Sequence, residues 1–295
     1  MTKTFGNFTA VDGFDLELGP GEIFGLLGPN AAGKTTTIRM LSGILRPTSG
    51  SASMLGFDLS TGLKQIKSRI GYVAQHFALY PELTVKENLS FYSSMYDNFD
   101  TGRQEKLLDI YDLRQFSSRY AGQLSGGYKR RLSIACAISH DPDLIFLDEP
   151  TAGIDPVTRK ELWDLFYDLA TEGKTLFVTT HYMEEAERCH TLSFLSSGRQ
   201  VAYGSPTQIR EHLEGKHVYA FDSGHDPKMM AALQQLDQVL VVNRFGNSVR
   251  VIGDSEFDLG KLQEFLNRWP QVASKPVAVS ATLEDVFITL TKNKQ

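Results

Sequence analysis

The sequence predicts an α/β protein with a mainly parallel central sheet that is covered by helices on both faces. Three short apolar runs, at 23–27, 144–147 and 175–179, are each followed by a segment with helical spacing. Continuous apolar runs are typical of strands buried on both faces, and strands that alternate with helices usually pair in parallel. We therefore expect strands at these runs and helices at about 34–45, 158–170 and 183–189.

A helical subdomain is predicted inside this core. From residue 84 to residue 120 the spacing is mostly helical, and one stripe carries Val85, Leu89, Tyr92 and Tyr96. Side chains spaced by three or four residues lie on one face of a helix. We place the inserted subdomain at about 84–140.

The C-terminal part of the chain has a different pattern after about Glu214. Its segments read strand, helix, strand, strand, helix, strand and a last helix, at about 218–221, 227–236, 239–242, 249–252, 259–269, 277–279 and 283–290. A βαββαβ order predicts a small ferredoxin-like α/β module. The predicted domains are therefore residues 1–214 and residues 215–295.

Composition limits the partners of the 295-residue chain. It is 41% hydrophobic, an ordinary globular value, and its formal net charge of −5 argues against nucleic-acid binding. The one dense basic run, at 129–131, is interpreted as a solvated helix face. No apolar run approaches the roughly 18 residues that cross a bilayer, so any membrane role is expected to come through a partner. Cys136 and Cys189 lie far apart, which predicts free thiols in a reducing compartment.

The first chemical motif is GPNAAGKTT at residues 28–36, between a predicted strand and a predicted helix. It contains the pattern G-x-x-x-x-G-K-[ST], whose backbone N–H groups close around phosphates at a helix N-terminus. Lys34 is expected to reach the β- and γ-phosphates and the Thr35 hydroxyl to ligate Mg²⁺. The alternative is a glycine-rich turn that happens to be followed by a lysine.

A second motif, LIFLDEP at 144–150, is an apolar strand that ends in two carboxylates. The carboxyl ends of strands are where α/β sheets bind ligands. Asp148 is suited to Mg²⁺, and Glu149 is suited to act as a general base on a water molecule. Alone, such a strand end is most often a solvated turn.

A third motif, LSGGY at 124–128, precedes a helix. Ser125, Gly126 and Gly127 would offer N–H groups, a hydroxyl and a helix dipole to an anion, whereas the alternative is that Ser125 is a plain N-cap. The chain would then carry two phosphate-binding sites but one lysine-bearing loop. One interpretation is that the second site serves a nucleotide held by another copy.

Together these motifs resemble the ABC transporter nucleotide-binding domain. GPNAAGKTT, LSGGY, LIFLDEP, the AGIDP that follows and TTH at 179–181 agree with that family in order and approximate spacing over about residues 1–210. The resemblance implies a phosphate-loop NTPase core. The tail, with ATLEDVFITL, resembles the C-terminal extension of daunorubicin-resistance-like exporter ATPases.

The resemblance also implies site residues. Gln75 resembles the Q-loop glutamine that senses Mg²⁺ and the membrane partner, His181 the switch histidine, and Asp155 the D-loop aspartate at the dimer interface. Without the resemblance they would be a surface glutamine, a structural histidine and an Asp-Pro turn. Phe5 is placed against adenine, with Phe8 as its rival.

The complete predicted set follows from these assignments. Catalysis is assigned to Lys34, Gln75, Glu149 and His181, and Mg²⁺ to Thr35, Gln75 and Asp148. ATP contacts are assigned to Phe5, Gly28, Pro29, Asn30, Ala31, Ala32, Gly33, Lys34, Thr35 and Thr36 of one copy and, from the other copy, to Ser125, Gly126, Gly127 and Asp155.

Three departures from the family pattern stand out. Ala31 replaces a usual glycine, and if that position needs a positive φ the alanine costs about 1 kcal/mol of strain and lowers nucleotide affinity. Tyr128 replaces a glutamine of the signature. The chain also begins at Met1 almost directly on the segment of Phe5, before which the family usually has an extra edge strand, so the start is interpreted as truncated or misassigned and the N-terminal edge is expected to be less stable.

The expected function is that of an ATP-hydrolysing ABC exporter subunit. Two copies, or one copy and a similar cassette, would enclose two ATP on the cytoplasmic face of the membrane and drive a separate permease for a drug, antibiotic or lipid-like cargo. The main competing hypothesis is a soluble ABC-type ATPase that is not linked to transport. Two weaker hypotheses are a phosphate-loop enzyme such as a GTPase or small-molecule kinase, and a degenerate regulatory cassette.

Overall fold

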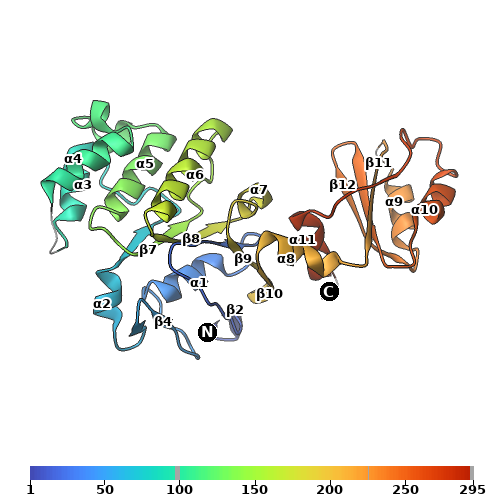
Figure 1. Cartoon of the computed structure of the whole chain (residues 1–295), viewed down its shortest axis with the longest axis horizontal. Helices are drawn as coiled ribbons and strands as arrows, with labels where there is room; N and C mark the ends of the chain where they lie inside the picture. The colour runs from blue at the N-terminus through green and yellow to red at the C-terminus, as the bar shows by residue number, and fades with distance from the viewer. Residues whose placement is uncertain (97–99, 225, 293–295) are drawn as a thin grey trace. The chain divides into compact units, whose positions relative to one another are not determined.

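The computed structural model describes residues 1–96, 100–224 and 226–292. The chain divides into two compact units, Met1–Tyr203 and Gly204–Gln295 (Figure 1). This division lies ahead of the predicted boundary after Glu214, because helix α8 (Pro206–Arg210) contacts the last helix, α11 (Leu283–Lys292), of the second unit.

The first unit is built on a six-stranded sheet of order β10-β9-β3-β8-β7-β6. Strand β3 pairs in parallel with β8 and β9, and β7 pairs in parallel with β6 and β8. The three predicted strands are confirmed as β3, β7 and β8. The strand bounds are β3 (Ile23–Leu27), β6 (Ile70–Val73), β7 (Leu144–Asp148), β8 (Thr175–Thr180), β9 (Thr191–Ser196) and β10 (Arg199–Gly204).

Helices cover both faces of this sheet, with α1 and α6 on opposite sides (Figure 1). Helix α1 (Lys34–Leu41) is shorter than predicted because Gly43 takes a left-handed φ of 67° just beyond its end, which is how many helices stop. Helix α6 is Pro156–Thr171, close to its prediction, while α2 is Leu63–Lys67 and α7 is the short turn Met183–Ala186.

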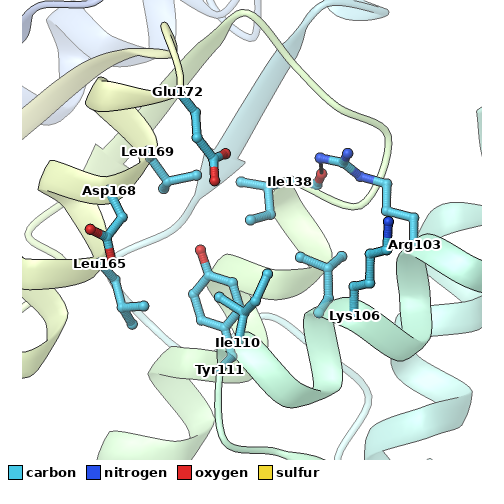
Figure 2. A pocket seen from close by; sticks show the side chains of 10 residues that line it. Arg103, Lys106, Ile110, Tyr111, Ile138, Leu165, Asp168, Leu169 and Glu172 are labelled. Carbon is cyan, nitrogen blue, oxygen red and sulfur yellow. Dashed lines mark hydrogen bonds between the residues drawn. The ribbon is translucent and has the colours of Figure 1, made fainter.

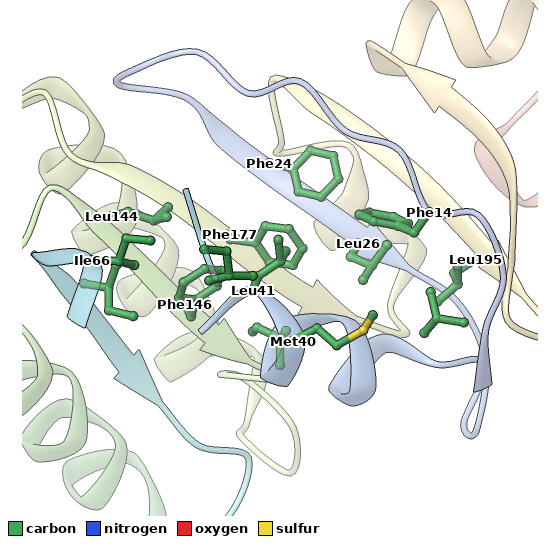
Figure 3. Packing of buried hydrophobic residues seen from close by; sticks show 14 of the residues in the cluster. Phe14, Phe24, Leu26, Met40, Leu41, Ile66, Leu144, Phe146, Phe177 and Leu195 are labelled. Carbon is green, nitrogen blue, oxygen red and sulfur yellow. The ribbon is translucent and has the colours of Figure 1, made fainter. Parts of the chain in front are cut away.

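The core of the first unit lies between the sheet and α1 (Figure 3). Phe24 of β3 packs on Phe177 of β8 with ring centroids 4.9 Å apart, and Phe146 of β7 lies on the other side of Phe177. Met40 of α1 belongs to the same buried cluster. Burial of these large side chains holds α1, the helix that follows the predicted phosphate loop, against the sheet.

The predicted helical subdomain is present between β6 and β7. Its helices are α3 (Val85–Ser93), α4 (Thr101–Ile110) and α5 (Gly126–Ala137), with 3₁₀ turns at Arg114–Phe116 and Ala121–Gln123. Thr84 and Glu87 form a capping box that starts α3. Val85 and Leu89 are fully buried, in agreement with the predicted stripe, and Tyr96 stacks on His140.

The N-terminal segment folds as a hairpin. Strand β1 (Lys3–Phe5) pairs antiparallel with β2 (Phe8–Val11), so the segment of Phe5 is itself a strand of a small separate sheet. A second small sheet consists of β4 (Ser53–Met54) and β5 (Phe57–Asp58).

The second unit has the predicted βαββαβ order. Its antiparallel sheet, of order β12-β13-β11-β14, is the ferredoxin-like arrangement. The Asp285 carboxylate of α11 pairs with Arg250 of β13 at 2.6 Å and joins the last helix to this sheet. The bounds are β11 (His217–Asp222), α9 (Pro227–Gln234), β12 (Val239–Phe245), β13 (Ser248–Gly253), α10 (Leu259–Leu266) and β14 (Val277–Ala278), after a 3₁₀ turn at Glu211–Leu213. Over the described ranges, no helix has the length and apolar content to cross a membrane.

Candidate ATP site

The loop between β3 and α1 is closely packed at its two glycines. A Cβ on Gly28 would lie 2.3 Å from the Leu195 carbonyl oxygen, and one on Gly33 would lie 2.5 Å from that of Ala10. Gly33, the N-cap of α1, has a φ of 109° and no side chain that could cap the helix. The first N–H groups of α1, which include those of Thr35 and Thr36, are therefore oriented to meet an anion.

Ala31 in this loop has a φ of 64°. This position therefore does take the left-handed backbone under which the sequence predicted strain. Such a backbone costs a non-glycine residue about 1 kcal/mol. The side chain is exposed, so no packing offsets this strain. Pro29 and Asn30 are exposed beside it, and Ala32 is buried.

Lys34 lies at the centre of the loop and is 4% exposed. Its Nζ donates to the Gly28 carbonyl at 2.8 Å and to the Pro29 carbonyl at 3.1 Å. The same ammonium lies 3.1 Å from Glu149 Oε1. The loop thus points its one lysine at the carboxylate predicted to be the general base.

Glu149 brings the four predicted catalytic residues together. Besides Lys34, its carboxylate accepts a hydrogen bond from Gln75 Nε2 at 3.0 Å and lies 3.3 Å from His181 Nδ1, both at Oε2. Gln75 follows β6, Glu149 follows β7 and His181 follows β8, so three neighbouring parallel strands deliver these side chains to one sheet edge.

The backbone of Glu149 is strained, with a φ of 46°. Thr179 holds it in place, because the Glu149 N–H lies 2.9 Å from the Thr179 hydroxyl and 3.2 Å from the Thr179 carbonyl. Strained residues held in this way are concentrated at functional sites.

Asp148 lies beside this cluster with oxygens that suit Mg²⁺. Its Oδ1 accepts a hydrogen bond from Thr179 Oγ1 at 2.7 Å, and Thr35 Oγ1 lies 3.5 Å from the same atom. In the described part of the chain no group of three or more His, Cys, Asp or Glu side chains could enclose a metal. One carboxylate with one hydroxyl fits Mg²⁺, which usually keeps several waters and binds substrate phosphates. The predicted third ligand, Gln75, instead contacts Glu149.

The segment with Ser125, Gly126 and Gly127 forms a different pocket. These residues line about 360 Å³ of surface space at the start of α5, together with Gly153–Asp155 (residues 153–155, here called the D-loop). Ser125 is the N-cap of α5, yet its side chain makes no capping hydrogen bond. The plain N-cap alternative is therefore not supported, and the hydroxyl remains available to a ligand.

The comparisons with known proteins agree with this geometry. A model of the ABC transporter family matches residues 11–152. The "Nod factor export ATP-binding protein I" of Burkholderia pseudomallei (strain 1710b) is 42% identical over 297 residues, which cover 99% of this chain and 95% of that protein. The chain belongs to the ABC transporter family of ATP-binding proteins.

Two further matches show how much of this chain, and how much of the matched protein, the similarity covers. The "Probable multidrug ABC transporter ATP-binding protein YbhF" of Escherichia coli (strain K12) is 42% identical over 239 residues, or 80% of this chain, but the chain spans only 40% of YbhF. A solved ATP-binding subunit of an ABC transporter matches with a TM-score of 0.66 at 28% identity over 72% of this chain and 90% of that one.

A dimeric post-hydrolysis structure of the ATP-binding cassette MJ0796, bound to ADP and Pi, matches with a TM-score of 0.63. It is 27% identical over 69% of this chain and 94% of that one. The first unit is thus a phosphate-loop NTPase cassette that binds and hydrolyses ATP.

Asp155 of this ABC cassette has a structural role within one copy, and its place at a dimer interface stays a prediction. Its Oδ1 accepts hydrogen bonds from the Val157 N–H at 3.1 Å and the Thr158 N–H at 3.0 Å, which caps α6. Contacts with Thr158 lower the pKa of the Asp155 carboxyl, so it stays ionised. Asp155 and Pro156 therefore begin α6 rather than form the Asp-Pro turn of the alternative, and Asp155 lines the same pocket as Ser125.

Two aromatic side chains remain candidates for adenine. Phe5 of β1 is 48% exposed and lies 5.0 Å from the Lys3 ammonium, and Phe8 of β2 faces it in the hairpin and is more exposed. Both rings are at the surface rather than in the core, and their exposure does not separate them.

Tyr128, which replaces the usual signature glutamine, lines the same pocket as Gly126 and Gly127. Its hydroxyl donates to Asp112 Oδ2 at 3.0 Å and its ring packs edge-on against Phe116. The substitution therefore fixes the start of α5 to the rest of the helical subdomain.

Arg130 is a site residue that the sequence pattern did not reveal, and the prediction of a solvated basic face at 129–131 is wrong for it. Arg130 is only 8% exposed. Its guanidinium donates to the Ala74 carbonyl at 2.8 Å and to the Gln75 carbonyl at 2.9 Å, and lies 3.5 Å from the Glu149 carbonyl. The spacing to buried Ile134, four residues on, was the available signal.

A further pocket of about 210 Å³ lies between α4 and α6, outside the ATP site (Figure 2). The Tyr111 hydroxyl points into it, and burial raises the pKa of that phenol. Arg103 lines one side and Glu172 another. It contains none of the predicted site residues.

Proposed function

We propose that two copies of this chain enclose two ATP molecules, each held between the phosphate loop of one copy and the signature segment of the other. The observation that carries this proposal is the division of the phosphate-binding groups between two places. Lys34 and the catalytic cluster lie at the sheet edge, while Ser125 and its glycines line a pocket of their own with the D-loop. Each place has half of a complete nucleotide site.

Hydrolysis is assigned to the Glu149 cluster. Lys34 and the N–H groups at the start of α1 bind and orient the phosphates, and the Glu149 carboxylate accepts a proton from the attacking water. Gln75 and His181 hold that carboxylate in position from two sides. Mg²⁺ between Thr35 and Asp148 would neutralise phosphate charge. The signature serine of the second copy contacts the same phosphates, so the dimer is tight only with ATP.

We infer that the cassette powers export through a separate membrane permease. The relatives are described as a multidrug transporter component and a Nod factor exporter component. On the basis of these two relatives, we propose a drug, antibiotic or lipid-like molecule as the cargo class. The permease would hold the chain at the cytoplasmic face of the membrane.

An exposed aromatic patch is assigned to the permease contact. Tyr80, Phe91 and Met95 are exposed, and the Tyr80 ring packs edge-on against Phe91 with centroids 5.0 Å apart. The patch follows Gln75 in the chain, so a partner bound there is connected to the Glu149 cluster. Clustered exposed aromatics mark protein contacts.

Subunit complementation tests the shared sites. Lys34→Ala disables the phosphate loop of its own copy, and Ser125→Arg disables the signature that a copy lends to its partner. Each variant alone spoils both sites of its dimer. Mixed dimers contain one intact site, so an equimolar mixture should hydrolyse ATP clearly faster than the mean of the two variants.

A mixture that is no faster than that mean, with both variants folded by circular dichroism, would refute shared sites.

The permease assignment has its own test. Tyr80→Ser and Phe91→Ser should leave soluble ATPase activity unchanged and reduce the amount of chain that co-purifies with membranes containing its permease.

A further inference from the structure

A buried carboxylate outside the Glu149 cluster joins the loop after Glu149 to the loop that carries His181. Glu185 lies in α7 and is 1% exposed. Its Oε1 accepts a hydrogen bond from the Thr151 hydroxyl, and its Oε2 accepts one from the Thr180 hydroxyl at 2.6 Å. Thr151 lies two positions after Glu149, and Thr180 directly precedes His181. One side chain therefore ties both catalytic loops together.

Thr180 passes this contact to the backbone beside His181. Its Oγ1 accepts a hydrogen bond from the Tyr182 N–H at 3.0 Å while it donates to Glu185. A hydroxyl that both donates and accepts has a fixed orientation. The Tyr182 and His181 rings have centroids 4.1 Å apart. The turn that presents His181 is thus held, through Thr180, by Glu185.

Arg159 extends the network to the D-loop. Its Nε lies 3.7 Å from Glu185 Oε1, and its Nη2 donates to the Ile154 carbonyl at 3.3 Å. Its guanidinium also lies 4.3 Å from the centroid of the Tyr182 ring. Arg159 therefore contacts the D-loop, the buried carboxylate and the His181 turn at once.

We propose that Glu185 and Arg159 are positioning residues that couple the D-loop of each copy to the His181 of the same copy. The inference rests on the proposed two-copy function, in which the D-loop borders the partner's ATP and His181 faces the copy's own ATP. The network then transmits the state of one ATP site to the other, which makes hydrolysis at the two sites cooperative.

The physical reason is that this network cannot absorb a D-loop shift locally. If the partner's ATP displaces Ile154, Arg159 must follow it or give up that hydrogen bond. Moving Arg159 changes its contacts with Glu185 and Tyr182, and a buried carboxylate is costly to leave without its donors and its counter-charge. The movement is therefore passed on to Thr180 and the His181 turn.

The test uses the full chain and measures ATPase rate against ATP concentration. Wild type should give a Hill coefficient clearly above 1. Arg159→Met keeps the apolar stem of the side chain and removes its charge and donors, and Glu185→Gln keeps the shape and removes the charge. Both should lower the Hill coefficient to about 1. Both should also reduce kcat roughly tenfold or more, with KM within about twofold, because His181 is misplaced rather than ATP released.

The controls use exposed neighbours. Glu184→Gln and Lys160→Met change the same types of charge on the same elements and should leave kcat and the Hill coefficient unchanged. Arg159→Lys, which keeps the charge, should recover part of the lost rate. If Glu185→Gln does not fold, Arg159→Met still decides the matter, because Arg159 is partly exposed and touches neither substrate nor Glu149.

A Hill coefficient of 1 for wild type, or wild-type kcat and Hill coefficient in folded Arg159→Met, would overturn the coupling. A failure of the proposed two-copy function would give a different result, because the Glu149→Gln variant would then not dimerise with Mg·ATP at all. If the two-copy function holds, the variant that combines Glu149→Gln with Arg159→Met should dimerise normally.

Discussion

The Lys34 ammonium and the Glu149 carboxylate form a buried ion pair, with Nζ 3.1 Å from Oε1. The group proposed to neutralise phosphates and the group proposed to activate water are therefore in direct contact, and phosphates would compete with Glu149 for the lysine. Lys34→Ala should weaken ATP binding by more than about tenfold, because it removes a charge-assisted contact. Titration with a fluorescent ATP analogue measures this.

The same variant leaves Glu149 without its nearest counter-charge, so thermal unfolding should be recorded beside the titration. Lys67→Ala, which removes an exposed lysine of α2, is the matched control and should bind nucleotide normally. Wild-type affinity in folded Lys34→Ala would show that the phosphate-loop assignment is wrong.

Ala31→Gly should bind nucleotide at least as tightly as wild type. Glycine relieves the strain of the 64° φ, about 1 kcal/mol. Its greater freedom in the unfolded chain costs about 0.4–1 kcal/mol, so the unfolding free energy should change little. Fluorescent titration and urea unfolding measure the two effects separately, and a clear loss of affinity would mean that the Ala31 methyl group makes a contact with the nucleotide.

Arg130→Met should slow hydrolysis by roughly tenfold or more while ATP binding is kept. The change leaves the half-buried Ala74 and Gln75 carbonyls without their donor, at a cost below the roughly 1–3 kcal/mol of a fully buried unsatisfied group. The backbone that presents Gln75 to Glu149 would then shift. Lys129→Met is the neighbouring control, and steady-state kinetics give kcat and KM for both. An unchanged kcat in folded Arg130→Met would contradict the positioning role.

His140 should make the protein sensitive to mild acid. Burial lowers the pKa of His140 to about 4, although its hydrogen bond to the Ile70 carbonyl opposes the shift. Because the folded pKa lies below the unfolded value, the stability from neutral His140 is complete above about pH 6.5 and is lost as the pH falls toward 4. The melting temperature of wild type should therefore fall more between pH 7 and pH 4 than that of His140→Gln. Parallel curves would contradict the low pKa.

The sequence alone predicts the three central strands, because buried strands depend on local apolar patterns, whereas Gln75 and His181 are assigned through the motif resemblance. Apolar runs such as 23–27 predict buried strands, and parallel strands place their following residues at one edge, which is why Gln75, Glu149 and His181 meet. The motif resemblance supplied their roles.

The remaining features depend on contacts between distant segments. Arg130 can be buried because its guanidinium donates to the carbonyls of Ala74 and Gln75, which lie 56 and 55 residues away in the chain. The boundary between the two units lies ahead of residue 214 because α8 contacts α11, from which it is separated in the chain by most of the second unit. The Glu185–Arg159 network joins three loops whose order in the chain does not reveal that they touch.

The most direct test of the two-copy mechanism is size exclusion of Glu149→Gln with Mg·ATP. The amide keeps the shape of the side chain but cannot accept the proton, so ATP stays intact and should hold a dimer at about twice the monomer mass. Without ATP the variant should elute as a monomer. Adding Ser125→Arg should abolish the dimer and leave single-copy ATP binding largely unchanged, because the cation would occupy the γ-phosphate position from the partner's side. A double variant that still dimerises with ATP would contradict the account.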